Sequence, residues 1–246
     1  MFVLPVEQIT KAEIRMMSTI EDAMHTIAFM TEYCREHGDN ELKQLTIADA
    51  FACLGGNTLS FCRTFGDVRA YETVEDRFER LQKTTSTFTN IQVFNQNCRD
   101  DNGILDNRFP RDVIFLDPPW ENPTTHEVDD SVFTEAIDLC SQIRRQTTTK
   151  YVFMKLPLQY SEKKHEIVDN VSNYERMLTS MDNDWIDISI NTVSRMKKWG
   201  PQPTYSIVCA CRKPTTSADT HPGHAHVTGH RVRLLLMQLA TLHELL

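Results

Sequence analysis

Residues 113–123 read VIFLDPPWENP, an apolar run that ends in an acid, two prolines and a tryptophan. Consecutive prolines cannot continue a hydrogen-bonded strand, so we expect the strand to end at Asp117. The Asp117 carboxylate and the Pro118 carbonyl would then be fixed acceptors for the N–H protons of an exocyclic amine, and such acceptors favour a tetrahedral nitrogen over the flat ground state. Trp120 would stack on the ring that carries the amine. We therefore predict that Asp117, Pro118, Pro119 and Trp120 form a catalytic motif that acts on the amino group of a base.

A second motif, DAFACLGGNT from Asp49 to Thr58, lies upstream. An apolar strand leads into Gly55 and Gly56 and then into a predicted helix, and ligands of open α/β sheets bind at such strand ends. The two glycines would let the backbone approach a ligand closely. The spacing matches neither a dinucleotide fingerprint nor a P-loop, which favours a nucleoside-like ligand over a polyphosphate. We expect Asp49 and the glycines to face the charged end of that ligand.

Two polar residues follow the next predicted strands. Glu72 closes the strand after the glycine motif, where an acid can accept hydrogen bonds from ribose hydroxyls. Asn97 follows the strand at 91–95, and its amide could pair with the edge of an adenine. An adenine, a ribose and a charged tail together predict S-adenosylmethionine as the cofactor.

These motifs, in this order, resemble the class I S-adenosylmethionine-dependent methyltransferases over residues 45–211. Within that class the chain looks most like trimethylguanosine synthase, which methylates the N2 amine of the 7-methylguanosine cap of RNA. The resemblance implies that Asp117 to Trp120 are the catalytic motif, with Trp120 stacked on the cationic cap base. It also implies an N-terminal helical extension that closes over the site. The cofactor-binding residues that it implies are Phe51, Gly55, Gly56, Asn57, Thr58, Glu72 and Asn97.

Two positions differ from the pattern of that family, which usually has Ser before Pro-Pro-Trp and two glycines after it. Here these positions hold Asp117 and Glu121-Asn122. Asp at the first position is typical of adenine N6-methyltransferases, so an adenine N6-methyltransferase on DNA or RNA is an alternative hypothesis. In the mRNA adenosine family, however, the motif precedes the glycines, whereas here it follows them. A non-catalytic binding or scaffold subunit with the same fold is a third hypothesis.

Basic residues near the predicted strand ends are candidates for contact with a capped RNA. Lys155 ends a predicted strand, and the run from Arg195 to Gly200 contains Lys197, Lys198 and Trp199. We predict that the lysines contact cap phosphates and that Trp199 forms a second aromatic wall. A net charge of −8 argues against a protein that coats nucleic acid. Recognition of a single RNA end requires only a few basic residues.

Apolar periodicity predicts an α/β fold in which strands alternate with helices. The expected strands are 45–51, 68–72, 91–95, 112–117, 151–156, 185–191 and 205–211, and the expected helices are 10–37, 58–64, 73–85, 130–145 and 162–181. Seven strands behind a leading helix predict one doubly wound, mostly parallel domain. The resemblance implies that this domain is a Rossmann-like methyltransferase sheet with an N-terminal helical extension.

The chain divides by composition into three segments. We predict an N-terminal helical extension at 1–40, a methyltransferase domain at 41–212, and a linker followed by a helix at 213–246. The apolar face of 231–246 would pack on the domain, on a second copy in a homodimer or on a partner protein. Cysteines in apolar settings and the lack of a signal-peptide pattern favour an intracellular protein, in nucleus or cytoplasm, without a membrane span. The histidines at 221–230 lack interleaved acids or cysteines, so we predict no metal site.

Overall fold

The computed structural model describes residue 13 and residues 17–121, 129–157, 185–197 and 200–212. Within these ranges one sheet has the strand order β3-β2-β1-β4-β5-β7-β6. The strands are β1 (Thr46–Asp49), β2 (Asp67–Glu72), β3 (Ile91–Asn95), β4 (Val113–Leu116), β5 (Tyr151–Pro157), β6 (Trp185–Lys197) and β7 (Gly200–Arg212). The helices are α2 (Ile20–Glu36), the short 3-10 helix η2 (Leu42–Gln44), α3 (Thr58–Thr64), α4 (Glu75–Thr85) and α5 (Asp130–Gln146).

The first five strands are parallel, and β7 runs antiparallel to both β5 and β6. All four residues of β4 are buried, as expected for a central parallel strand that is covered on both faces. The predicted α/β class with a mostly parallel sheet is therefore confirmed. Parallel neighbours place their carboxyl ends at one edge of the sheet, and the loops after β1, β2 and β4 meet there.

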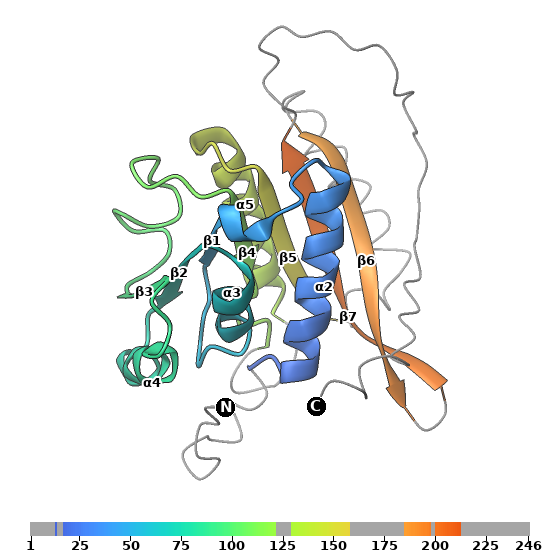
Figure 1. Ribbon diagram of the computed structural model, residues 1–246, viewed down its shortest axis with the longest axis horizontal. Coiled ribbons are helices and arrows are strands. Elements are labelled where there is room, and N and C mark those ends of the chain that lie inside the picture. The colour runs from blue at the N-terminus through green and yellow to red at the C-terminus, as the bar shows by residue number, and fades with distance from the viewer. Residues whose placement is uncertain (1–12, 14–16, 122–128, 158–184, 198–199, 213–246) are drawn as a thin grey trace, which may run out of the picture.

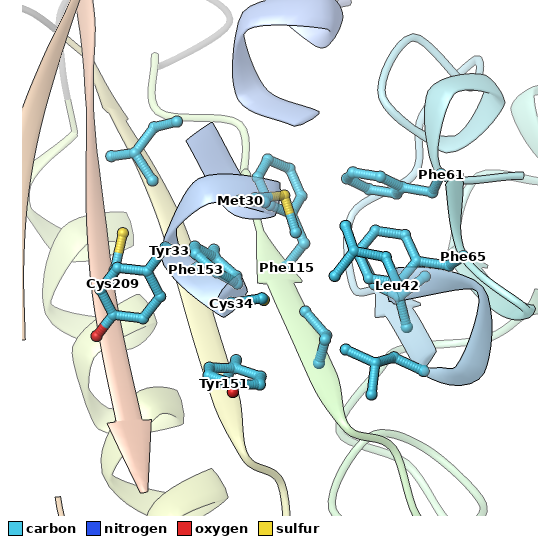
Figure 2. Packing of buried hydrophobic residues seen from close by; sticks show 14 of the residues in the cluster. Met30, Tyr33, Cys34, Leu42, Phe61, Phe65, Phe115, Tyr151, Phe153 and Cys209 are labelled. Carbon is cyan, nitrogen blue, oxygen red and sulfur yellow. The ribbon is translucent and has the colours of Figure 1, made fainter. Parts of the chain in front are cut away.

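Helices cover both faces of the sheet. Figure 1 shows α2 and α3 on one face and α5 on the other. Met30, Tyr33 and Cys34 of α2 belong to one buried cluster with Phe61 of α3 and Phe115 of β4. Figure 2 shows this packing, in which the Phe61 and Phe115 rings meet edge to face with centroids 5.1 Å apart. On the opposite face α5 contributes Ala136, Leu139 and Ile143 to a second cluster, the α5-side cluster.

The leading helix that the periodicity predicts is interrupted in the structure, where Glu13 is helical but the chain at 17–19 is not. The prediction spans 10–37, but Met17 to Thr19 are not helical and α2 begins at Ile20. The Thr19 hydroxyl caps the helix by accepting the Asp22 N–H at 3.2 Å. The prediction of helix through 17–19 was therefore wrong, because a capping side chain outweighs apolar spacing at a helix end.

The other predicted elements agree closely with the structure where it describes them. The strand at 91–95 and the helix at 58–64 match in both bounds, and β6 and β7 are longer than predicted. Cys209 and Cys211, predicted to face one side, both lie in the cluster beneath α2. The predicted helices at 162–181 and 231–246 and the linker at 213–230 lie outside the described residues. None of the helices in the described ranges is both long and apolar enough to cross a bilayer.

Candidate active site

The side-chain alternation of three central strands brings three charged residues to one face of the sheet. Asp49 pairs with Phe115, two residues before Asp117, and Leu116 pairs with Met154, one residue before Lys155. Phe115 and Phe153 both face α2 and α3. Because side chains repeat every two residues along a strand, Asp49, Asp117 and Lys155 project toward this same face, at its carboxyl edge.

Four side chains from four segments form one hydrogen-bond network at this edge. Lys155 Nζ lies 3.1 Å from Asp117 Oδ2 and 2.6 Å from Ser18 Oγ. Asn57 Nδ2 donates to the same two oxygens, at 3.2 Å and 2.9 Å. Ser18 Oγ also donates to Asp117 Oδ2 at 3.3 Å. The Asp117 carboxylate is thus held through Oδ2, whereas its Oδ1 accepts the Trp120 Nε1–H at 3.3 Å.

The start of α2 delivers Ser18 to this network. Ser18 directly precedes the capping residue Thr19, and its backbone rests against Gly56. A Cβ added to Gly56 would lie 2.5 Å from the Ser18 carbonyl oxygen, so no larger residue fits there without displacing the segment. Gly56 was predicted to admit a ligand, but in the structure its open side accommodates Ser18.

A pocket of about 220 Å³ opens beside the network. It is lined by Met17, Ser18, Asp22, Asp117, Pro118, Pro119, Trp120, Glu121, Lys155, Leu156, Pro157 and Tyr205. Its lining therefore includes all four residues of the predicted catalytic motif. Among these lining residues Lys155 is the only cation, while Asp22, Asp117 and Glu121 are acids.

Asp49 is buried beneath the glycine turn. Asp49 is 1% exposed, and its Oδ2 accepts a hydrogen bond from the Thr58 hydroxyl at 2.7 Å. Burial raises the pKa of Asp49 to about 7, against the opposing effect of the Thr58 hydrogen bond, and the nearby Asp117 raises it further. The other oxygen, Oδ1, has no hydrogen-bond partner in the part of the chain that the structure describes.

A second buried acceptor lies close by in the sequence and has the same character. The amide oxygen of Asn57 is also without a hydrogen-bond partner among the described residues. Between these two residues Gly55 has φ +92°, a conformation that L residues with a side chain rarely adopt. Buried acceptors without donors are costly unless a ligand supplies the donors. This donor-poor turn fits a ligand with positive charge or N–H groups, as predicted for the cofactor tail.

Three other predicted cofactor residues have different surroundings. Glu72 ends β2, is buried, and accepts the Val74 N–H at 2.8 Å with Oε1. Phe51 is half-buried and packs on the α5-side cluster. Asn97 is exposed, and its amide oxygen accepts the Arg99 N–H at 3.0 Å within a local turn. The atom of Asn97 that was predicted to read an adenine is thus engaged by its own loop.

Trp120 lies at the pocket wall but is mostly buried. It is 8% exposed and packs with the α5-side cluster, its ring centroid 6.5 Å from that of Phe133. The prediction gave Trp120 an open face for stacking on a base. The structure instead covers most of the indole and directs its N–H to Asp117. Its placement also makes the indole a support for the carboxylate.

The predicted basic contacts separate into described and undescribed residues. The Lys155 ammonium points to Asp117 and Ser18 rather than standing free at the rim, and it lies 4.9 Å from the centroid of the Tyr205 ring. Lys197 ends β6, but its side chain is not among those described, and Lys198 and Trp199 lie outside the described residues.

Sequence reasoning missed several residues of the site, among them the polar residues Ser18, Asp22 and Tyr205. Tyr205 is held by hydrogen bonds to the Asp22 carbonyl at 2.8 Å and to the Thr26 hydroxyl at 3.1 Å. A signal for the first two exists in the sequence, since Thr19-Ile-Glu-Asp22 has the spacing of a capping box. That pattern places the helix start after Thr19 and leaves Ser18 in a loop. Nothing local marks Tyr205.

Comparisons with known proteins give relatives of modest similarity. No known family model matches the chain. A curated protein of Acanthamoeba polyphaga mimivirus, named Uncharacterized protein L320, is 28% identical over 135 residues, which make up 50% of this chain and 50% of that protein. The chain therefore spans about half the length of the curated relative that it matches.

Solved structures with a similar arrangement include several methyltransferases. A protein assigned as an rRNA methylase from Clostridium thermocellum has a TM-score of 0.49 and 12% identity, covering 76% of this chain and 97% of its own. A protein assigned as a methyltransferase from Streptococcus mutans, in complex with SAH, has a TM-score of 0.47 and 13% identity, covering 74% and 97%. Magnesium protoporphyrin IX methyltransferase from Synechocystis, with bound SAM, has a TM-score of 0.47 and 12% identity, covering 77% and 79%.

Proposed function

We propose that the protein transfers a methyl group from S-adenosylmethionine to an exocyclic amine of a nucleobase, with the N2 amine of the 7-methylguanosine RNA cap as the acceptor. The observation that carries the proposal is the pocket at the end of β4, where the Asp117 carboxylate and the Pro-Pro-Trp segment line one cavity with Lys155 and Tyr205. Residues 41–212 would form the catalytic domain, and capped RNA would be its partner.

The size and charge of the pocket support a single cationic base as the acceptor. Its volume of about 220 Å³ is below the ~300–1,000 Å³ usual for drug-sized ligands. Three acids and one lysine line it, so the lining is acidic overall. A 7-methylguanine ring carries a positive charge and is attracted to such a lining, whereas unmodified guanine is neutral.

The residues beneath the pocket support binding of the cofactor next to it. Asp49 Oδ1 and Asn57 Oδ1 are buried acceptors that would hold the α-ammonium group of S-adenosylmethionine. When bound, this cofactor would supply a methyl group from a positively charged sulfur, which would leave as a neutral thioether, while the acceptor nitrogen would give up a proton.

Asp117 would orient the acceptor amine. Oδ2 already accepts from three donors, so Oδ1 is the oxygen with capacity for an amine N–H. The Pro118 carbonyl would be the second acceptor. Two acceptors on one amine draw its protons out of the ring plane and favour the nitrogen lone pair needed for attack.

A carboxylate at position 117 also favours a second candidate, adenine N6 methylation on DNA or RNA. The N6 amine of adenine can donate hydrogen bonds to a carboxylate. Adenine is neutral, so its binding does not require an acidic pocket lining. A duplex substrate would have to extrude its base to reach the pocket.

A transfer assay with labelled methyl donor separates these functions. Three acceptors are compared: a 7-methylguanosine triphosphate cap analogue, the same analogue without the N7 methyl group, and an adenine-containing oligonucleotide. The proposal predicts label on the first alone, with loss of ~10²-fold or more in Asp117→Ala. Label on adenine alone would establish the second candidate instead.

Isothermal titration with the methyl donor tests the remaining hypothesis. A catalytic protein binds the donor and loses affinity in Asp49→Ala. Absence of donor binding by a correctly folded parent chain would contradict methyl transfer and leave a binding or scaffold role.

A further inference from the structure

The Asp117 carboxylate is held on one side by a dense set of donors. Lys155, Asn57 and Ser18 all donate to Oδ2, at 3.1, 3.2 and 3.3 Å. A carboxylate oxygen has about two lone-pair sites, so three donors saturate Oδ2. Oδ1 accepts one long bond, from Trp120 Nε1 at 3.3 Å. The two oxygens of one carboxylate are therefore divided between a structural side and a side turned to the pocket.

Ser18 uses its whole hydrogen-bonding capacity in this arrangement. Its hydroxyl accepts from Lys155 Nζ at 2.6 Å and from Asn57 Nδ2 at 2.9 Å, and it donates to Asp117 Oδ2 at 3.3 Å. A serine hydroxyl offers one proton and two lone pairs, so each is matched here. Ser18 thus fixes the relative positions of the lysine, the amide and the carboxylate.

The Lys155 ammonium is held by two groups of the network and flanked by an aromatic ring. Its ammonium contacts Ser18 and Asp117 and lies 4.9 Å from the centroid of the Tyr205 ring. The lysine and aspartate side chains are 14% and 13% exposed, so solvent screens their attraction only in part. A lysine placed in this way has little reach for a phosphate outside the pocket.

We propose that Lys155 is a positioning residue, which together with Ser18 clamps Asp117 through Oδ2 so that Oδ1 is presented to the acceptor amine. The role in transfer rests on the proposed function, whereas the pairing of Lys155 with Asp117 can be tested without it. The N-terminal segment that carries Ser18 is then a part of the site, because it closes the clamp.

Other charged groups near Asp117 make Lys155 decisive. Asp49 on β1 interacts electrostatically with Asp117, and Asp22 on α2 and Glu121 after the motif line the same pocket. All three are acids, and when ionised they repel the negative charge of Asp117. Among the described residues that line the pocket, Lys155 alone offsets them. Without it we expect the Asp117 carboxylate to turn away from these acids and to lose its fixed orientation.

The indole N–H of Trp120 provides a probe that does not depend on activity. It donates to Asp117 Oδ1, so its ¹⁵N-resolved NMR signal responds when that carboxylate moves. The chain has three tryptophans, and Trp120→Phe identifies the signal. In Lys155→Met we expect the signal to move from its position in the parent spectrum, and Lys155→Arg restores the parent position.

Lys150→Met is the matched control. Lys150 lies just before β5 and also pairs with carboxylates, Asp39 at 3.6 Å and Asp112 at 3.4 Å, but it is absent from the pocket lining. Its replacement leaves the Trp120 signal unchanged. A signal at the same position in the parent, Lys155→Met and Lys150→Met would overturn the proposed pairing. Ser18→Ala, which deletes one hydroxyl, also displaces the signal and replaces Lys155→Met if that variant does not fold.

Kinetics then test the role in transfer. Lys155→Met lowers kcat by about 10²-fold, with the KM for the methyl acceptor changed less. The reason is that a misplaced Asp117 carboxylate no longer orients the amine for attack on the methyl group. A raised KM with unchanged kcat would instead assign Lys155 to phosphate binding. If the parent methylates none of the tested acceptors, the proposed function fails, while the position of the indole signal still decides the pairing.

Discussion

Replacement of Asp49 by asparagine removes a charge that the fold holds away from water. Asp49 is 1% exposed, and its Oδ1 is without a hydrogen-bond partner in the described part of the chain. Burial raises its pKa from 3.8 to about 7. Asparagine has nearly the same shape and keeps an oxygen for the Thr58 hydroxyl, so the substitution changes mainly the ability to ionise.

The sign and size of the effect follow from the two pKa values. Between pH 3.8 and about 7 the folded protein keeps a proton on Asp49 that the unfolded chain has lost. The free energy of unfolding of the parent therefore falls as the pH rises through this window and is level above it. At about 1.4 kcal/mol per pKa unit the whole window is worth ~4 kcal/mol, of which ~3 kcal/mol lies between pH 5 and pH 8.

Denaturant unfolding of both proteins from pH 5 to pH 8 measures this difference. We expect Asp49→Asn to gain ~3 kcal/mol on the parent across this range, whatever constant offset the new amide introduces. Asp76→Asn makes the same chemical change on α4, where the Asp76 side chain is 75% exposed, and serves as the control without such a trend. A difference between parent and Asp49→Asn that does not change with pH would refute the idea that Asp49 is a buried, strained charge.

The same carboxylate predicts a proton release that accompanies donor binding. A cationic donor favours ionised Asp49, which is mostly protonated in the free protein at pH 6, below its pKa of about 7. Calorimetry in buffers of different ionisation enthalpy should show close to one proton released at pH 6, and little at pH 8. Asp49→Asn should bind the donor more weakly and release none at either pH. Equal proton release by the two proteins would contradict the assignment.

Three further substitutions test how the site is assembled. Gly56→Ala places a methyl group 2.5 Å from the Ser18 carbonyl oxygen, so we expect a loss of ~1–3 kcal/mol in stability and a displaced Trp120 indole signal. An unchanged spectrum would show that the Ser18 backbone does not contact Gly56. Thr19→Ala removes the cap of α2 and should cost ~1 kcal/mol, seen as a ~2–4 °C lower Tm; Thr19→Ser should retain the parent Tm. Tyr205→Phe keeps the ring beside Lys155 but loses the hydrogen bond to the Asp22 carbonyl, so stability should fall by ~1 kcal/mol while the indole signal of Trp120 stays at its parent position.

Local patterns predicted the elements that surround the site. The continuous apolar run at 113–116 predicts a buried strand, and Pro118 and Pro119 end it for lack of backbone N–H groups. The helix at 58–64 follows the turn with Gly55 at φ +92°, a backbone conformation that depends on glycine. Each of these features depends on neighbours in the chain, which a sequence displays directly.

Partners across the fold could not be predicted in this way. Trp120 reads as an open stacking face beside a proline pair, yet α5 covers it, because the opposite face of the sheet needs large apolar side chains. Lys155 reads as a free cation at a strand end, but the parallel register sets it beside Asp117. Burial and pairing of this kind depend on which strands become neighbours, and local spacing carries little information on that choice.

The sequence by itself determined the order of strands and turns, the carboxylate on its rigid proline segment, and the glycine turn that precedes it. Only the tertiary structure brought Ser18, 99 residues from Asp117 in the chain, into contact with that carboxylate, and Tyr205 to the side of Lys155. The physical reason is range: backbone conformation follows from adjacent residues, whereas the environment of a charge is decided by whatever the packed sheet and helices place within a few ångströms of it.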